Sequence, residues 1–374
     1  MTAARLRWAE VDLGALAHNI GQVRGRLRAG SGLIAVIKAN AYGHGSVTVA
    51  RVAVREGADW LAVATVGEAV ELRRAEVEAP ILLLGPVAPG AEAEAIALDL
   101  RLSVYDAAGV ERLARAADEA SSRPRVHLKV DTGMARLGCS PDEALLLARR
   151  ISDQGRLELE GLWTHFAEAD DPASRRTQKQ LQAFLAVVAA LAAAGISPPV
   201  LHCANSASAL LFPSTHLVLV RCGLPIYGYA STAETVEGLD LRPALTWKSR
   251  VVAVHDLAEG DRVGYGGSYR APGPVRVATV STGYADGYRR TWSNRGEVLI
   301  AGVRVPVVGR VSMDYLTVDA SAVPDVAMGD EVVIMGRQGS QAISADDLAR
   351  GQDTISWEVL TMIGSRVERV EIGG

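Results

Sequence analysis

Short, almost continuous apolar runs recur at regular intervals along most of the chain. Segments with helical periodicity lie between them, some with helix-start signals, such as Ser140-Pro141 ahead of 144–151. Strands that alternate with helices form parallel sheets buried on both faces. Eight runs before about residue 235 predict a closed (β/α)8 barrel of the TIM type rather than an open sheet. The runs are Leu33–Ile37, Trp60–Ala64, Ile81–Leu84, Leu102–Val104, Val126–Val130, Leu159–Trp163, Val200–His202 and Leu217–Val220.

The rest of the chain follows a different pattern. From about residue 241, β-branched runs are separated by Gly, Pro and Asp, which is typical of strands joined by turns, and helical periodicity returns at 344–350 and 356–363. We therefore expect a barrel over residues 1–240, opened by a helix that Asp12 caps, and a mostly β domain over 241–374 with which residues 1–10 could pair. The expected strands of this domain are Leu245–Val254, Val275–Ser281, Glu297–Ala301, Val303–Val308, Val311–Val318 and Glu331–Met335.

Composition narrows the class of protein. A chain of 374 residues exceeds the usual size of one core, and 49% hydrophobic with 22% charged residues is ordinary for a soluble globular protein. The formal net charge of −4 gives no basic face for nucleic acid. The apolar stretch 183–196 is too short to span a bilayer and predicts a buried, Ala-rich helix, and the N-terminus has no signal-peptide core. We expect a soluble, cytoplasmic protein without nucleic-acid or membrane partners.

The cysteines and histidines exclude two kinds of site. Cys139, Cys203 and Cys222 lie far apart and include no Cys-x-x-Cys pair, which argues against a disulfide framework and suits a reducing cytosol. Histidines do not cluster with cysteines or carboxylates at metal-ligand spacing, so no metal site is expected.

A lysine, Lys38, closes the first apolar run. Active sites of such barrels lie at the carboxyl ends of the strands, so this lysine is expected at the barrel mouth, partly desolvated. Desolvation disfavours the ammonium form and leaves a nucleophilic amine. A lone lysine at a strand end more often extends its amine into solvent, but the hydroxyl of Tyr42 and the flexible Gly43 and Gly45 favour a ligand site here.

The seventh and eighth runs are followed by residues suited to an anion. Asn205 and Ser206 follow the seventh run, and Arg221 and Gly223 end the eighth. Barrels commonly hold a phosphate at these two places, and backbone N–H groups at a helix start bind anions. Helix capping explains Asn205 and Ser206 equally well.

Polar residues also follow other runs. Lys129 lies at the end of the fifth run, Arg136 follows it, and His165 follows the sixth, where a histidine is most often a hydrogen-bonded structural residue. The β domain contains three glycine-bearing segments, around Tyr265, Tyr284 and Met313. The segment around Tyr265 does not fit a nucleotide-binding loop, and in isolation such segments are usually hairpin turns.

Taken together, these segments resemble the alanine racemase family over essentially the whole chain, in family order. The segment around Lys38, Ala-Val-Ile-Lys-Ala-Asn-Ala-Tyr-Gly-His-Gly, is similar to the family's attachment signature for pyridoxal 5'-phosphate (PLP). The resemblance implies a barrel followed by a β domain, a homodimer with active sites shared across the interface, and a PLP-dependent isomerase. The implied reaction interconverts L- and D-alanine and supplies D-alanine for peptidoglycan.

The resemblance also assigns roles to residues. Lys38 carries the cofactor and is one catalytic base, and Tyr265 is the second base, which reaches the cofactor of the other subunit. Arg136 and the Met313 backbone amide contact the substrate carboxylate, and Tyr284 lines the entrance. Lys129 matches a lysine that is carbamylated in some members. The other cofactor-binding residues are Tyr42, Asn205, Ser206, Gly223 and Leu224 near the phosphate, Arg221 facing the pyridine nitrogen, and His165 supporting Arg221.

One position departs from the family pattern. The family usually reads Ser-Tyr-Glu where this chain reads Ser356-Trp357-Glu358. The tyrosine helps to bind the phosphate and shape the substrate pocket, so Trp357 leaves open a racemase for serine or another amino acid. A decarboxylase of similar architecture would place a glutamate where this chain has Arg221. A Schiff-base aldolase, or a PLP-binding homeostasis protein built on the barrel alone, would not need the domain that carries Tyr265.

Overall fold

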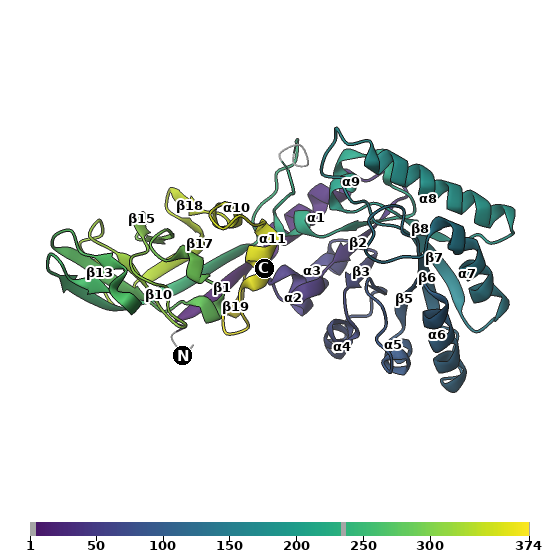
Figure 1. Cartoon of the computed structure of the whole chain (residues 1–374), viewed down its shortest axis with the longest axis horizontal. Helices are drawn as coiled ribbons and strands as arrows, with labels where there is room; N and C mark the ends of the chain where they lie inside the picture. The colour runs from purple at the N-terminus through teal and green to yellow at the C-terminus, as the bar shows by residue number, and fades with distance from the viewer. Residues whose placement is uncertain (1–4, 233–236, 374) are drawn as a thin grey trace. The chain divides into compact units, whose positions relative to one another are not determined.

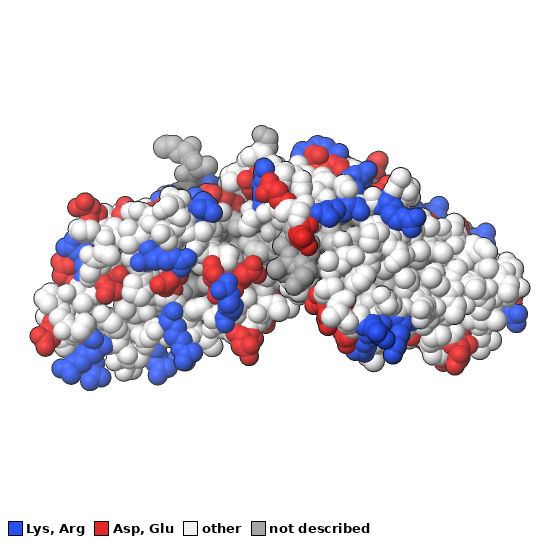
Figure 2. All heavy atoms as spheres, turned by 90° about the horizontal axis from the view of Figure 1, so that it is seen from above, with Lys and Arg blue, Asp and Glu red and all other residues white. Residues whose placement is uncertain are grey.

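The computed structural model describes residues 5–232 and 237–373 and divides the chain into two compact units. The barrel unit comprises residues 15–41 and 45–242, and the β unit comprises 1–14, 42–44 and 243–374. None of the helices in the described part of the chain combines the length and apolar character that crossing a bilayer requires. On the face drawn in Figure 2, basic and acidic side chains are interspersed.

Within the described residues, the barrel unit contains eight parallel strands in the order β8-β7-β6-β5-β4-β3-β2-β9. The Val218 N–H donates to the Leu201 carbonyl at 3.0 Å and the Arg221 N–H to the Ala204 carbonyl at 3.1 Å, which joins the segments of β8 and β9. The barrel prediction is therefore confirmed, with every expected run forming a strand. The strands are β2 (Gly32–Val36), β3 (Trp60–Val63), β4 (Ile81–Leu83), β5 (Leu100–Val104), β6 (Arg125–Lys129), β7 (Glu158–Trp163), β8 (Val200–His202) and β9 (Leu219–Cys222).

Helices surround these strands (Figure 1). The start predicted at Ser140 is confirmed, because its hydroxyl accepts from the Glu143 N–H and the Glu143 carboxylate accepts in return, a capping box. The Ala-rich helix is not buried as expected: it is amphipathic, with Phe184, Val187 and Leu191 buried and most alanines on the other face exposed. The helices are α1 (Leu13–Arg24), α2 (Lys38–Tyr42), α3 (Ser46–Arg55), α4 (Val66–Arg74), α5 (Glu92–Ala97), α6 (Ala107–Glu119), α7 (Pro141–Asp153), α8 (Arg176–Ala193) and α9 (Ser206–Leu211).

The long strand β10 (Leu245–Leu257) organises the β unit. It pairs with β1 (Arg7–Asp12), β13 (Val275–Val280) and β17 (Glu331–Gln338), all antiparallel. β1 also pairs in parallel with β19 (Glu368–Ile372). The remaining elements are β11 (Arg262–Val263), β12 (Tyr269–Arg270), β14 (Glu297–Ile300), β15 (Val303–Pro306), β16 (Leu316–Asp319), β18 (Gln341–Ile343), α10 (Ala345–Arg350) and α11 (Ser356–Met362).

One expected strand is much shorter than predicted. The run 311–318 was expected to be a strand throughout, but pairing begins at Leu316. The Ser312 N–H donates to the Tyr315 carbonyl at 2.9 Å and closes a turn, which leaves Met313 and Tyr315 exposed. The apolar side chains that suggested a strand therefore project from a loop.

A buried ion pair holds β1 to the loop after β13. Asp286 is fully buried, pairs with Arg7 at 2.8 Å, and accepts from the Gly283 N–H at 3.0 Å. We expect Asp286→Ala to destabilise the protein by about 3–5 kcal/mol, because it leaves a largely buried guanidinium without its partner. The shift in the denaturant midpoint measures this effect. Asp256→Ala, which removes the exposed carboxylate paired with Arg276, should change the denaturant midpoint little, and equal losses in the two variants would contradict the prediction.

Candidate active site

Lys38, two residues after the end of β2, begins a turn of unusual handedness. The next four residues, Ala39 to Tyr42, have φ values of 53°, 53°, 51° and 52°, which is a left-handed helical turn. This conformation costs L-residues about 1–2 kcal/mol each. Such strain persists where the surroundings determine the backbone, and it is concentrated at functional sites.

Several hydrogen bonds hold the barrel-unit part of this turn. The Ala39 N–H donates to the Glu68 carboxylate at 2.7 Å, and the Ala41 N–H to the Ile37 carbonyl at 2.9 Å. The Asn40 side-chain oxygen accepts from the Ser46 N–H at 2.9 Å and from its hydroxyl at 3.1 Å. The sequence did not indicate Glu68 or Ser46 as site residues, because their role depends on the turn.

The Lys38 amine lies in a partly buried, cationic environment. Burial and the nearby positive charge of Arg136 lower its pKa, while Glu68 acts in the opposite direction. This is the direction expected for a lysine that must present a neutral, nucleophilic amine.

Arg221 is buried at the end of β9. Its Nη1 donates to His202 Nδ1 at 2.8 Å, and its Nη2 lies 2.8 Å from the Thr164 carbonyl and 3.3 Å from His165 Nδ1. Burial lowers the pKa of Arg221 to about 10, so the guanidinium remains protonated at neutral pH. The contact with His165 matches the support that the resemblance implied.

The indole of Trp163, which the sequence did not indicate, contacts two cationic side chains of the site. The Lys129 amine is 4.2 Å and the Arg221 guanidinium carbon 4.9 Å from the ring centroid of Trp163, and the His202 ring stacks on the indole at 5.4 Å. Contact with an aromatic face stabilises desolvated cations. Burial, with Arg221 and Arg136 nearby, lowers the pKa of Lys129 to about 8.

The loops after β8 and β9 meet where a phosphate was expected. The Ser206 hydroxyl accepts from the Gly223 N–H at 2.9 Å. Asn205 caps α9 by accepting from the Ser208 N–H at 3.1 Å, and its amide donates to the Phe166 carbonyl at 3.2 Å. Leu224 is buried at the start of a 3-10 turn. Asn205 therefore caps α9 and ties it to the Phe166 backbone. Ser206 and Gly223 are joined by a hydrogen bond where the two loops meet.

In the β unit, close backbone packing brings the glycine-bearing segments together. A Cβ on Gly283 would lie 2.3 Å from the Met313 carbonyl oxygen, and the Tyr284 N–H donates to the Ser312 carbonyl at 3.0 Å. A Cβ on Gly309 would lie 3.0 Å from the Val263 carbonyl oxygen, next to the Tyr265 segment. These segments are therefore parts of one surface rather than isolated turns.

Two residues that the sequence did not indicate join these segments. The Asn294 side chain accepts from the Gly309 N–H at 2.6 Å and donates to the Ser268 hydroxyl at 3.1 Å. The Ser293 hydroxyl accepts from the Val311 N–H at 3.0 Å. The surface exposes Tyr265 by 71%, Met313 by 52% and Tyr284 by 43%.

The Tyr42 segment and the α11 helix, which carries Trp357, also lie in the β unit. A Cβ on Gly43 would lie 2.3 Å from the Leu360 carbonyl oxygen, and Arg369 Nε donates to the Gly43 carbonyl at 2.8 Å. Glycine is thus required for this segment to approach α11. The predicted residues divide between the units, with Lys38, Lys129, Arg136, His165, Asn205, Ser206, Arg221, Gly223 and Leu224 in the barrel unit and Tyr42, Tyr265, Tyr284, Met313 and Trp357 in the β unit.

The donor set of the barrel mouth fits an anionic carbonyl cofactor such as PLP. Besides burial, the positive charge of Arg136 lowers the pKa of Lys38, and the charges of Arg221, Arg136 and Lys38 lower the pKa of Lys129, so cationic side chains gather here. The phosphate of such an aldehyde would balance these positive charges, and its carbonyl carbon would be the electrophile for the Lys38 amine. Within residues 5–232 and 237–373, no group of three or more His, Cys, Asp or Glu side chains is placed to hold a metal ion.

Comparison with known proteins agrees with this geometry. Residues 11–231 match the family model described as "Alanine racemase, N-terminal domain", and residues 244–371 match "Alanine racemase, C-terminal domain". An alanine racemase from Symbiobacterium thermophilum is 46% identical over 369 residues, which is 98% of this chain and 97% of that protein.

Solved structures agree as well. The alanine racemase from D-cycloserine-producing Streptomyces lavendulae is 39% identical, with a TM-score of 0.93 and coverage of 100% of this chain and 98% of that one. An alanine racemase from Bartonella henselae with covalently bound pyridoxal phosphate is 27% identical, with a TM-score of 0.85 and coverage of 98% and 100%. The chain is an enzyme that belongs to the alanine racemase family.

Proposed function

We propose that this protein interconverts L- and D-alanine with PLP as its cofactor. The observation that carries the proposal is the desolvated amine of Lys38 among the cationic side chains of the barrel mouth. The activity test is D-alanine formation from L-alanine by the purified protein, with L-serine offered in parallel because Trp357 replaces the usual tyrosine. No turnover of either amino acid would overturn the proposal, and turnover of serine alone would change the substrate.

The cofactor would be held by the side chains to which the resemblance assigns that role. Lys38 would attach it covalently, Arg221 would face its pyridine nitrogen, and His165 would support Arg221. When bound, PLP withdraws electrons from the substrate Cα and so acidifies its proton. Its phosphate would be bound by Tyr42, Asn205, Ser206, Gly223, Leu224 and Trp357.

Two bases would carry out the proton transfers. Racemisation removes the Cα proton on one face and returns a proton on the other, which two groups on opposite faces accomplish most simply. In this assignment, the Tyr265 oxygen removes the Cα proton of L-alanine, and Lys38 Nζ removes the Cα proton of D-alanine. Arg136 and the Met313 amide would bind the substrate carboxylate, and Tyr284 would line the entrance.

Tyr265 is proposed to act in a homodimer. Its exposed fraction of 71% is unusual for a catalytic tyrosine within one chain, and Met313 beside it is 52% exposed. Exposed apolar side chains of this kind mark interaction surfaces. The β unit of one subunit would thus supply the second base to the barrel of its partner.

Arg221 is proposed to select the reaction. Because its guanidinium stays protonated and donates hydrogen bonds, it cannot give the pyridine nitrogen a full proton as a carboxylic acid would. A less electron-deficient ring stabilises the substrate carbanion less. Arg221 would therefore disfavour protonation away from Cα, the step that leads to transamination.

Lys129 is proposed to carry a carbamate. With a pKa of about 8, a large fraction of its amines is neutral at mildly alkaline pH, and the nearby Arg221 and Arg136 would stabilise an anion. Its amine would add to CO2 with loss of one proton, so the carbamate should be lost as the pH falls below about 8. A 13C-bicarbonate NMR experiment should show this signal, and its persistence in Lys129→Ala would contradict the assignment.

The proposed role in the cell is the supply of D-alanine for peptidoglycan in the cytoplasm. Growth of a D-alanine auxotroph that expresses this chain checks that role. Growth that still required added D-alanine would count against it.

A further inference from the structure

Two histidines occupy interior positions of the barrel that apolar side chains usually fill. The interiors of such barrels are mostly packed with branched apolar side chains. Here His127 from β6 and His202 from β8 are both fully buried, and the His127 ring packs edge-on to Trp60 from β3 at 5.4 Å. Contacts among β3, β6 and β8, which are not neighbours, place these rings in the barrel interior.

Three hydrogen bonds join these rings into a continuous relay. Arg221 Nη1 lies 2.8 Å from His202 Nδ1, and His202 Nε2 lies 2.9 Å from His127 Nδ1. His127 Nε2 lies 2.9 Å from the Glu160 carboxylate. The relay (Arg221, His202, His127 and Glu160) leads from the residue assigned to the pyridine nitrogen to a carboxylate on β7.

The chemistry of the two ends fixes the direction of every bond. A guanidinium can only donate, so His202 Nδ1 accepts and the His202 proton lies on Nε2. That proton is donated to His127 Nδ1, which places the His127 proton on Nε2, facing a carboxylate that accepts it. Both rings are then neutral, and burial lowers the pKa of both histidines, in agreement with this state.

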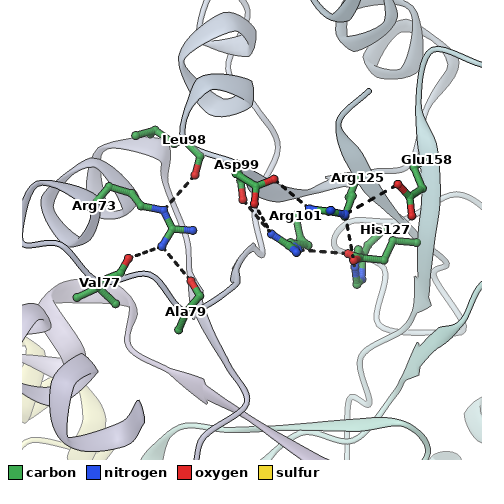
Figure 3. Close-up of polar contacts among 10 residues, drawn as sticks. Arg73, Val77, Ala79, Leu98, Asp99, Arg101, Arg125, His127 and Glu158 are labelled. Carbon is green, nitrogen blue, oxygen red and sulfur yellow. Dashed lines mark hydrogen bonds and ion pairs between the residues drawn. The ribbon is translucent and has the colours of Figure 1, made fainter. Parts of the chain in front are cut away.

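The carboxylate end of the relay is anchored by arginines. Glu160 lies 3.4 Å from Arg101 Nε and 3.7 Å from Arg125 Nε. Asp99 pairs with both arginines, at 3.0 and 3.1 Å, and Figure 3 shows this network beside His127. Gly161 on β7 leaves the space that the ring needs, since a Cβ there would lie 2.1 Å from His127 Nδ1.

We propose that His127 and Glu160 are positioning residues that fix the His202 tautomer and, through it, the orientation of Arg221. The inference deepens the proposed function, because it rests on Arg221 facing the cofactor. If His127 did not accept a hydrogen bond from His202 Nε2, His202 could carry its proton on Nδ1 instead. That N–H would then face the N–H of Arg221, and the hydrogen bond between them would be lost. A chain of hydrogen bonds aligned in one direction also brings the influence of the Glu160 charge toward a buried cation.

The proton positions can be observed without measuring activity. Long-range 1H–15N spectra of the 15N-histidine-labelled protein report which imidazole nitrogen carries a proton. We expect His127 and His202 to be neutral and protonated at Nε2, with exchange-protected N–H protons. Protonation of His202 at Nδ1, or a cationic ring at either position, would overturn the inference.

Two variants of His127 distinguish the loss of its hydrogen-bond acceptor from the loss of its volume. His127→Leu removes the acceptor for His202, whereas His127→Asn places an amide oxygen close to the site of Nδ1 and keeps it. We expect His127→Leu to lower kcat roughly 10- to 100-fold, as for a lost hydrogen bond that supports a charged group. We also expect more pyruvate per racemisation event, since transfer of the amino group to the cofactor leaves pyruvate. His127→Asn should recover most of both losses.

The controls distinguish this inference from the proposed function. Ser103→Ala removes a different buried polar group of the barrel strands, a hydroxyl that donates to the Leu83 carbonyl, and should change neither measurement. Equal losses in the Leu and Asn variants, with unchanged pyruvate, would show a merely structural role and reject the inference. Wild-type protein that racemises no amino acid would reject the proposed function, while the tautomer result would still decide the proton positions.

Discussion

Lys38→Ala should abolish alanine racemisation, with kcat/KM at least about 10⁴-fold below that of the unaltered protein. The variant loses both the covalent attachment and one of the two proposed bases, and a general base contributes about 10²–10⁴-fold. The desolvation that lowers the pKa of this amine is the structural reason for expecting it to react. The measurement is D-alanine formation by the purified protein, together with the absorbance of bound PLP.

Chemical trapping of the bound cofactor tests whether Lys38 is the residue that carries it. Borohydride reduction of the unaltered protein should fix PLP on the peptide that contains Lys38. Lys179→Ala, which replaces an exposed lysine of α8, should leave both activity and trapping unchanged. Trapped cofactor on another lysine, or substantial racemisation by Lys38→Ala, would contradict the assignment.

Tyr265→Phe should affect the two enantiomers differently. Loss of the hydroxyl should lower racemisation in both directions by about 10²–10⁴-fold, because each direction needs both groups. Exchange of the Cα proton with deuterium from solvent should fall sharply for L-alanine but persist for D-alanine, whose proton Lys38 removes. Tyr269→Phe on β12 is the matched control and should exchange both enantiomers normally. Equal loss of exchange from both enantiomers would rule out the division of labour.

Mixing the two inactive variants tests whether Tyr265 acts across subunits. In a mixed dimer of Lys38→Ala and Tyr265→Phe chains, one site would combine an intact lysine with an intact tyrosine from the partner. Activity should therefore reappear after the variants are unfolded and refolded together. If the tyrosine served its own chain, each chain would remain defective and no activity would return.

The sequence was most informative about the barrel because its strands are apolar on both faces. Each expected run formed a strand, and the lysine and arginine that end the first and last runs lie at strand ends in the structure. The short β1 and β19 were harder to recognise, because charged residues such as Arg7, Glu10 and Glu368 interrupt their apolar pattern. The run 311–318 shows the opposite error, since its apolar residues belong partly to an exposed turn.

Sequence motifs could not show which side chains support the candidate site from behind. Trp163 is the last residue of an apolar run, and its contacts with two cations depend on barrel closure. Asn294 connects segments that are distant in sequence, and its side-chain hydrogen bonds have no local signature. A histidine and a glutamate inside predicted strands gave no reason to expect an ordered relay.

The left-handed turn after β2 has a consequence for chirality. Ala39, Asn40, Ala41 and Tyr42 hold an L-peptide in the backbone geometry that D-residues prefer, at a cost of roughly 4–8 kcal/mol for the four. D-alanine at positions 39 and 41 of a synthetic chain would adopt these φ values without the backbone strain that L-alanine has there. The residues that follow the reactive lysine thus adopt the backbone conformation of D-residues although they are L-residues. They do so beside a site that is proposed to interconvert L- and D-alanine.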